Sequence, residues 1–202
     1  MRLAGMPAML YPISEGRFGR CVHLPHRLGF MNKHWIDGPR RPEGRRQGRS
    51  PDPTEYSAIV LGATGNVGGR IVQLLIKNPL CRKVVVVTRR KTDTFADPKV
   101  SEVVVNMDRL EEEVTPHAQG VDIALAAFGV GKGSAKMPEA EVRKIEIAWP
   151  QAFCRAAKVG GARVCGVMTA IGADPKAGMK YAKIIGEKEK AVESVGFDFL
   201  GL

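Results

Sequence analysis

The stretch SAIVLGATGNVGGRIVQLL, from Ser57 to Leu75, decides the fold of this chain. It begins with a short apolar run, passes through Gly62, Gly65 and Gly68, and continues with apolar residues at helical spacing. A strand buried on both faces of a parallel sheet has such a continuous apolar run. The order of strand, glycine turn and helix predicts a dinucleotide-binding turn, with a purely structural turn as the less favoured alternative.

Each glycine of this turn has its own steric role. Gly62 permits the tight turn, Gly65 lets a pyrophosphate approach the backbone, and Gly68 lets the helix pack close to the strand. The N-terminus of the helix that follows presents free N–H groups and a partial positive charge to the phosphates. We therefore expect a nicotinamide dinucleotide to bind here.

The rest of the chain repeats the alternation of strand and helix. Apolar runs recur at residues 83–90, 101–107, 121–129 and within 160–170, and a further one begins at 197. Helical patterns cover 139–158, where Pro150 must start or kink a helix, and 180–196. Trp149 and Phe153, four residues apart, are expected to pack a helix against the sheet. This alternation predicts an α/β domain over residues 57–202, with a Rossmann-like, doubly wound parallel sheet and helices on both faces.

The end of the second predicted strand distinguishes between the two nicotinamide cofactors. An acid at this place bonds the ribose 2′-hydroxyl of NAD, whereas arginine accommodates the 2′-phosphate of NADP. The chain has Thr88, Arg89, Arg90 and Lys91 here and no acid. Because a planar guanidinium can hold a phosphate with two hydrogen bonds, we expect NADP(H) rather than NAD(H). An exposed basic loop is the alternative.

Several short motifs in one order resemble a known superfamily. They are GATGNVGG at 62–69, VTRRK at 87–91, FG at 128–129, GGARV at 160–164, GAD at 172–174 and KYAKIIGEKE at 180–189. Together they resemble the atypical short-chain dehydrogenases/reductases, and most of all the group of the human Tat-interacting tumour suppressor, an oxidoreductase-like protein. The resemblance covers about residues 57–202. The cofactor-binding residues that it implies are Gly62, Thr64, Gly65, Asn66, Val67, Arg89, Arg90, Ala127, Phe128 and Gly129.

The resemblance also implies two catalytic residues, Tyr181 and Thr169. The family has a Ser or Thr after the fifth strand and a YxxxK motif on the next helix, where the lysine lowers the pKa of the tyrosine. Tyr181 matches the tyrosine, and Thr169 keeps a hydroxyl that can polarise a carbonyl. However, Ile185 stands at the position of the lysine, and Ala170 stands where many members have a second serine.

No neighbouring lysine repairs the motif in the sequence. Lys183 lies on the other side of the helix, and Lys188 lies on the face of Tyr181 but almost two turns away, too far for direct pairing. The run of Lys and Glu from Lys183 to Lys190 is expected to form a solvated helix face. The sequence therefore predicts an NADP(H)-binding oxidoreductase with a degraded Tyr/Lys dyad. The alternative is a non-catalytic NADP(H)-binding module that senses redox state or regulates a protein partner.

The two ends of the chain depart from this domain. The sequence FDFLGL at 197–202 stops where family members continue into a substrate-side segment, so we expect a C-terminally truncated domain. Residues 1–56 carry ten Lys or Arg against five Asp or Glu, half of the net charge of +10. Their Pro, Gly and Arg content predicts a disordered, solvated extension rather than a specific nucleic-acid surface. We expect a cytoplasmic protein, or one of a mitochondrion or plastid if this extension is a transit peptide.

Composition excludes other classes of protein. No window has the roughly 18 uninterrupted apolar residues of a membrane-spanning helix, so we expect a soluble protein without a transmembrane segment. The four cysteines, Cys21, Cys81, Cys154 and Cys165, form no CxxC pair and have no histidine at ligand spacing. We therefore expect reduced thiols and no metal site.

Overall fold

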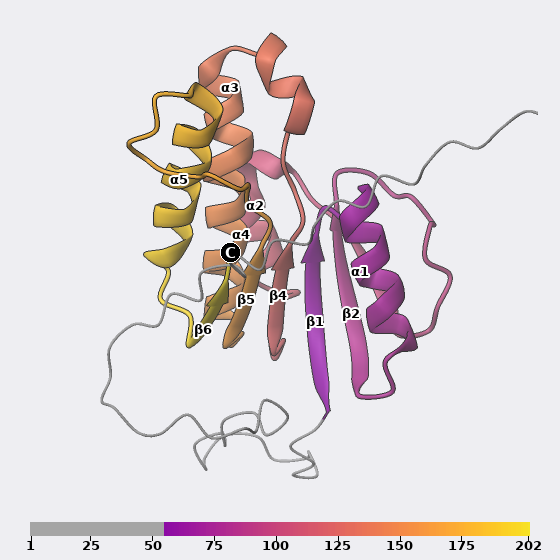
Figure 1. Ribbon diagram of the computed structural model, residues 1–202. Helices are drawn as coiled ribbons and strands as arrows, with labels where there is room; N and C mark the ends of the chain where they lie inside the picture. The colour runs from indigo at the N-terminus through magenta and orange to yellow at the C-terminus, as the bar shows by residue number, and fades with distance from the viewer. Residues whose placement is uncertain (1–54) are drawn as a thin grey trace, which may run out of the picture.

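The computed structural model describes residues 55–202, so the predictions for the N-terminal extension lie outside the described residues. Within this part, a parallel sheet has the order β3-β2-β1-β4-β5-β6 (Figure 1). Its strands are β1 (Tyr56–Leu61), β2 (Cys81–Thr88), β3 (Val100–Val104), β4 (Ile123–Ala126), β5 (Val164–Val167) and β6 (Phe199–Gly201). The predicted doubly wound parallel sheet is confirmed.

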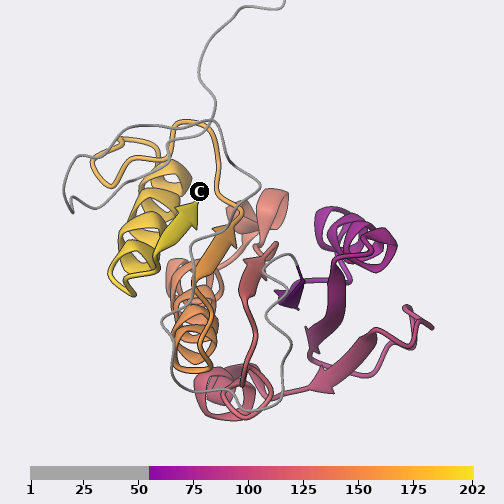
Figure 2. The same ribbon diagram turned by 90° about the horizontal axis from the view of Figure 1, so that it is seen from below.

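Helices cover both faces of the sheet. Helix α1 (Asn66–Lys77) lies on one face, and α2 (Leu110–Val114), α4 (Trp149–Val159) and α5 (Lys180–Glu193) lie on the other (Figures 1 and 2). Helix α3 (Glu139–Arg143) runs through a π-helical turn, η3 (Lys144–Ala148), into α4. Two 3₁₀ turns, η1 (Met107–Arg109) and η2 (Gly131–Lys136), complete the elements. Pro150 lies in the first turn of α4, as predicted.

The apolar runs of the strands feed two hydrophobic cores, one on each face. Alternate residues of β1 point to opposite faces: Ala58 and Val60 pack under α1, and Ile59 and Leu61 pack under the larger helical layer. Phe153 of α4 is fully buried in this second core. Trp149 packs against its edge, so the predicted packing of this pair is confirmed.

The register of the strands places the start of each connecting loop at one edge. Leu61, the last residue of β1, pairs with Val87 of β2 and Ala126 of β4, and Ala126 pairs with Val167 of β5. The strand order reverses between β1 and β4, and ligands of open α/β sheets bind at the carboxyl ends of strands at such a point. The fold thus directs attention to the loops after β1, β2, β4 and β5.

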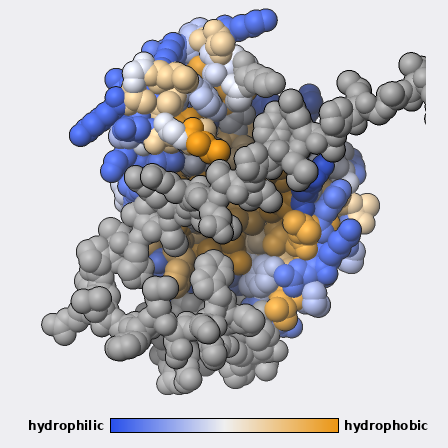
Figure 3. All heavy atoms as spheres, viewed as in Figure 1, coloured by the Kyte–Doolittle hydropathy of each residue, from blue (hydrophilic) through white to orange (hydrophobic). Residues whose placement is uncertain are grey.

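Among residues 55–202, no helix is both long enough and apolar enough to span a membrane. On the face shown in Figure 3, apolar residues are interspersed with hydrophilic ones. The most exposed large apolar side chains of the described part include Ile171 and Met179, both in the connection from β5 to α5.

Candidate functional site

The turn between β1 and α1 is held tightly against the segment after β4. Gly62 has φ +88°, and a Cβ there would lie 2.4 Å from the carbonyl oxygen of Ala127. At Gly68, a Cβ would lie 2.1 Å from the carbonyl oxygen of Gly62. Both positions therefore require glycine, one for its conformation and close approach, the other for close approach alone. This confirms the steric reading of these two glycines.

The N-terminus of α1 opens to solvent beside this turn. Its N-cap residue, Gly65, has no side chain that could cap the first N–H groups. Thr64, Asn66 and Val67 are exposed around it. An uncapped helix N-terminus beside a glycine turn fits a pyrophosphate, whose charge complements the positive end of the helix dipole. The geometry therefore accommodates the phosphates of a dinucleotide.

Arg89 and Arg90 follow β2 directly and are exposed at the same edge of the sheet. They begin a long connection to β3 that contains no helix and in which Asp93 has φ 49°. Lys91 in this connection is paired with Asp93, with 3.0 Å between Nζ and Oδ1. Arg89 and Arg90 therefore present two exposed guanidinium groups at the end of β2, next to a lysine that is already in an ion pair.

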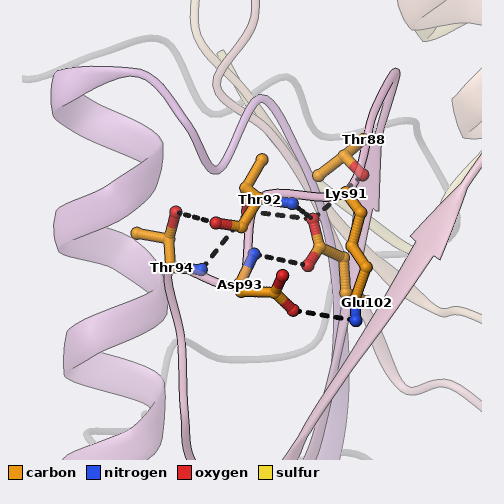
Figure 4. Close-up of polar contacts among 6 residues, drawn as sticks. All are labelled: Thr88, Lys91, Thr92, Asp93, Thr94 and Glu102. Atoms are coloured by element: carbon orange, nitrogen blue, oxygen red, sulfur yellow. Dashed lines mark hydrogen bonds and ion pairs between the residues drawn. The ribbon is translucent and has the colours of Figure 1, made fainter.

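Glu102 of β3 holds this connection in place (Figure 4). Its Oε1 accepts hydrogen bonds from the Thr92 amide at 2.8 Å, the Thr92 hydroxyl at 2.9 Å and the Thr88 hydroxyl at 3.2 Å. Its Oε2 accepts one from the Asp93 amide at 3.2 Å. Burial opposes ionisation, but these hydrogen bonds outweigh it and hold the pKa of Glu102 below its usual value. Glu102 therefore anchors the loop that follows the two arginines.

A pocket of about 280 Å³ lies beside this anchor, lined by Lys91, Asp93, Phe95, Ala96, Val100 and Glu102. Its lining mixes charged and apolar side chains from the β2–β3 connection and from β3 itself. Glu102 was not among the residues predicted for the site. Its role depends on the pairing of β2 with β3, and no local motif reports that register.

The segment after β4 contains the predicted residues Ala127, Phe128 and Gly129. Ala127 is buried, and the Phe128 ring lies 5.8 Å from the Trp149 ring at a tilt of 49°. Gly129 is exposed, yet a Cβ there would lie 2.9 Å from both carboxylate oxygens of Glu146. The backbone of this segment therefore runs directly past a buried carboxylate.

The structure corrects the prediction of a solvated Lys/Glu face at one position. The Lys188 side chain is only 2% exposed and the Glu146 side chain 1%, with 3.2 Å between Lys188 Nζ and Glu146 Oε2. Helix α5 packs on the sheet, and Lys188 lies on its inner side together with Ile184 and Ile185. A run of charged residues does not by itself show which of its side chains face the core, so the burial of Lys188 could not be predicted from the sequence.

Tyr181 reaches the same carboxylate from the first turn of α5. Its hydroxyl donates to Glu146 Oε1 over 3.4 Å. Burial and the negative charge of Glu146 raise the pKa of Tyr181 to about 12. Ile185, one turn further along α5, is 1% exposed and brings no charge. A lysine in place of Ile185 would lower the pKa of Tyr181, whereas the surroundings of Tyr181 in this chain raise it.

The other predicted catalytic residue, Thr169, lies two residues beyond β5 and is partly exposed. The structure thus places Tyr181 and Thr169 in the region of the carboxyl ends of β4 and β5.

Two cysteines also meet in the core. Cys154 and Cys165 are free thiols with 3.6 Å between their sulfur atoms, a proximity that could not be predicted from their positions in the sequence. Residues 55–202 contain no group of His, Cys, Asp and Glu side chains that could hold a metal ion.

The chain is similar in sequence to a family of NAD-binding domains and to proteins from fungi and from a mammal. Residues 57–149 match the family model described as the semialdehyde dehydrogenase, NAD binding domain. The chain is 30% identical over 144 residues to Protein FMP52, mitochondrial, of Candida albicans, covering 70% of this chain and 62% of that protein. It is 29% identical over 149 residues to Protein HTATIP2 of Rattus norvegicus, covering 72% and 60%. The chain thus spans about three fifths of the length of these curated relatives.

The fold is also found among solved structures. The Citrobacter sp. triphenylmethane reductase complexed with NADP(H) superposes with a TM-score of 0.54 at 20% sequence identity. The superposition covers 70% of this chain and 47% of the reductase. A likeness at this level of identity supports the Rossmann fold and leaves the choice of cofactor to the residues of this chain.

Proposed function

We propose that this chain, whose described residues form a Rossmann-like α/β domain, belongs to the atypical short-chain dehydrogenase/reductase superfamily and binds NADP(H). The site extends along the carboxyl ends of β2, β1 and β4. The observation that carries this proposal is the arrangement of an uncapped α1 N-terminus beside two exposed arginines at the end of the neighbouring strand. The N-terminus of α1 can bind a pyrophosphate, and the two arginines can bind an additional phosphate.

Each part of the cofactor has residues of matching chemistry. The amides around Gly65, Asn66 and Val67, with the Thr64 hydroxyl, suit the pyrophosphate. Arg89 and Arg90 suit the 2′-phosphate, because each guanidinium can donate two hydrogen bonds to it. The nicotinamide end would then run past the segment Ala127–Gly129.

A reductase activity is the finer form of the proposal. The bound cofactor would supply the hydride, as in other nicotinamide enzymes. Tyr181 would donate its phenolic proton to a carbonyl oxygen, and the Thr169 hydroxyl would donate a hydrogen bond to that oxygen. Ile185 leaves Tyr181 without the adjacent positive charge, so we propose slow turnover.

A non-catalytic NADP(H)-binding module is the second candidate function. The observation that favours it is the Tyr181 hydroxyl, whose proton is directed to Glu146 and whose pKa is raised to about 12. Such a module would report the redox state of the nucleotide to a protein partner. Turnover of NADPH with a panel of aldehydes and ketones separates the two candidates, because the module would show none.

The names of the fungal relatives bear on localisation. The Candida albicans relative is called mitochondrial, which favours the organelle alternative over the cytoplasm for this chain. We propose that residues 1–56 direct import. Imaging of fluorescent fusions with and without these residues tests this, and cytoplasmic signal from both fusions would contradict it.

Replacing Arg89 and Arg90 by alanine tests the cofactor proposal. We expect the double variant to bind NADPH about 10- to 100-fold more weakly, since it loses charge-assisted hydrogen bonds, and to bind NADH nearly unchanged. Arg155→Ala is the control, because Arg155 lies on α4 in a surface ion pair with Glu111. Equal weakening of both nucleotides, or of neither, would show that the arginines do not read the 2′-phosphate.

A further inference from the structure

A buried ion pair joins three elements of the site. Lys188 Nζ of α5 lies 3.2 Å from Glu146 Oε2 of η3. The same ammonium donates to the carbonyl oxygen of Phe128, after β4, at 3.3 Å, and to that of Met168, after β5, at 2.9 Å. Lys188 thus binds the carboxyl ends of two neighbouring strands and a carboxylate at once.

The partners of Lys188 account for its hydrogen bonds in the core. An ammonium has three hydrogens, and two of the three oxygens around Lys188 are carbonyl oxygens, which can only accept hydrogen bonds. Burial lowers the pKa of Lys188, while Glu146, Cys154 and Glu189 act in the opposite direction. Lys188 therefore donates to both carbonyl oxygens and lies within hydrogen-bond distance of the Glu146 carboxyl group.

The other oxygen of Glu146 holds two groups of the site. Its Oε1 accepts the Val130 amide at 2.7 Å and the Tyr181 hydroxyl at 3.4 Å. The loop after β4 and the predicted proton donor are therefore attached to the same atom. Glu146 is the group that connects Lys188 to both.

The local structure is arranged around this carboxylate. Glu146 lies in a π-helical turn, an irregularity found frequently at functional sites. Gly129 leaves room for it, because a Cβ there would lie 2.9 Å from both of its oxygens. A buried ion pair is often no more stabilising than apolar side chains of similar volume, so stability alone gives little reason for this one.

We propose that Lys188 and Glu146 form a positioning pair for this site, which fixes the Tyr181 hydroxyl and the Val130 amide through the Glu146 carboxylate. The role of Tyr181 as a donor beside the nicotinamide rests on the proposed function; the pair itself does not. Ile185 carries no charge, so the electrostatic partner of Tyr181 in this chain is Glu146, backed by Lys188.

The consequence is a tyrosine that stays protonated. Burial is the largest of the three causes that raise the pKa of Tyr181; the other two are the negative charge of Glu146 and the hydrogen bond to its carboxylate, and Glu146→Gln removes that charge. A pair that only fills space in the core, without an electrostatic contact to the Tyr181 hydroxyl, would leave the ionisation of Tyr181 unchanged. The titration of this one phenol therefore separates positioning from packing.

The experiment labels the full chain with 3-fluorotyrosine and follows Tyr181 by ¹⁹F NMR as the pH rises. Fluorine makes phenols more acidic, which brings the titration to lower pH, and Tyr181→Phe assigns the signal. In Glu146→Gln we expect the ionisation midpoint of Tyr181 to fall by about one unit, a tenfold change in its acid constant. Glu187→Gln is the matched control, because Glu187 lies on α5 like Tyr181 but pairs with Arg143.

A second variant covers the case in which Glu146→Gln leaves Lys188 unpaired and unfolds the domain. In Glu146→Gln/Lys188→Met both charges are removed at similar volume, and a smaller fall in the same direction is expected, because the loss of the Lys188 cation partly offsets the loss of the nearer carboxylate. An unchanged midpoint in a folded variant overturns the proposal. The readout needs no cofactor, so a chain that fails to bind NADPH but shows the fall retains the positioning pair and loses only the proposed function.

Discussion

Gly68 lies closer to the preceding turn than any side chain would allow. Its missing Cβ would be 2.1 Å from the Gly62 carbonyl oxygen, and backbone rather than a flexible side chain stands in the way. We expect Gly68→Ala to lower the free energy of unfolding by about 1–3 kcal/mol through overpacking and to weaken nucleotide binding. Urea unfolding measures the first effect.

Gly178→Ala is the control for this substitution. Gly178 has no atom within 4 Å of the position that its Cβ would take, so the added methyl meets open space. Equal stability of Gly68→Ala and Gly178→Ala would mean that the turn can relax and that its close packing is not required.

Single residues divide clearly into those that the sequence reveals and those that it does not. The steric roles of Gly62 and Gly68 could be predicted, because both glycines belong to a local motif of strand, glycine turn and helix. Lys188 and Glu146 are not, because they meet across 42 residues through the packing of α5 on the sheet. A buried charge is recognised only once the inner face of its helix is known.

Among the elements, the connection from β2 to β3 depends most on one side chain. Glu102 accepts hydrogen bonds from the Thr92 and Asp93 amides through separate oxygens. In Glu102→Gln, the amide nitrogen cannot accept, so one of these bonds is lost. We expect the Asp93 amide to exchange with solvent about tenfold faster, as for the loss of roughly one hydrogen bond.

The same loop should depend on pH. Hydrogen bonding in the fold holds the pKa of Glu102 below its usual value, so its contribution is present above the unfolded-state pKa of about 4.3 and is lost as pH falls through the lower, folded-state pKa. Amide exchange measured between pH 3 and 6 checks this. Glu112→Gln, in an exposed ion pair with Arg109, is the control, and a loop insensitive to both acid and Glu102→Gln would contradict the assigned role.

Elements with strong periodicity were predictable, and their ends were less so. The strand predicted at 101–107 ends at Val104, because Asn106 caps the turn η1 by accepting the Asp108 amide at 2.9 Å. Helix α2 was missed because LEEEV is a single short, acidic turn with little apolar pattern. The π-helical turn before Pro150 also has no signature in sequence.

At the scale of the whole molecule, the Rossmann domain has two regions at the carboxyl ends of its strands, and we propose that one binds the cofactor and that the other holds Tyr181 and Thr169. The β1–α1 turn and the arginines after β2 keep the chemistry of a cofactor site. The region after β4 and β5 replaces the expected lysine by Ile185 and connects Tyr181 to the Glu146–Lys188 pair. The fold was predictable from alternating strands and helices, whereas this second arrangement required the packing of α5.

Binding of NADP(H) can be measured by titrating the purified chain with NADPH and with NADH while following nicotinamide fluorescence. We expect saturable binding of both nucleotides with a preference of at least about tenfold for NADPH, because Arg89 and Arg90 can donate charge-assisted hydrogen bonds to its 2′-phosphate. Equal affinity or a preference for NADH would contradict the role of the arginines. No saturable binding of either nucleotide would contradict the proposed function as a whole.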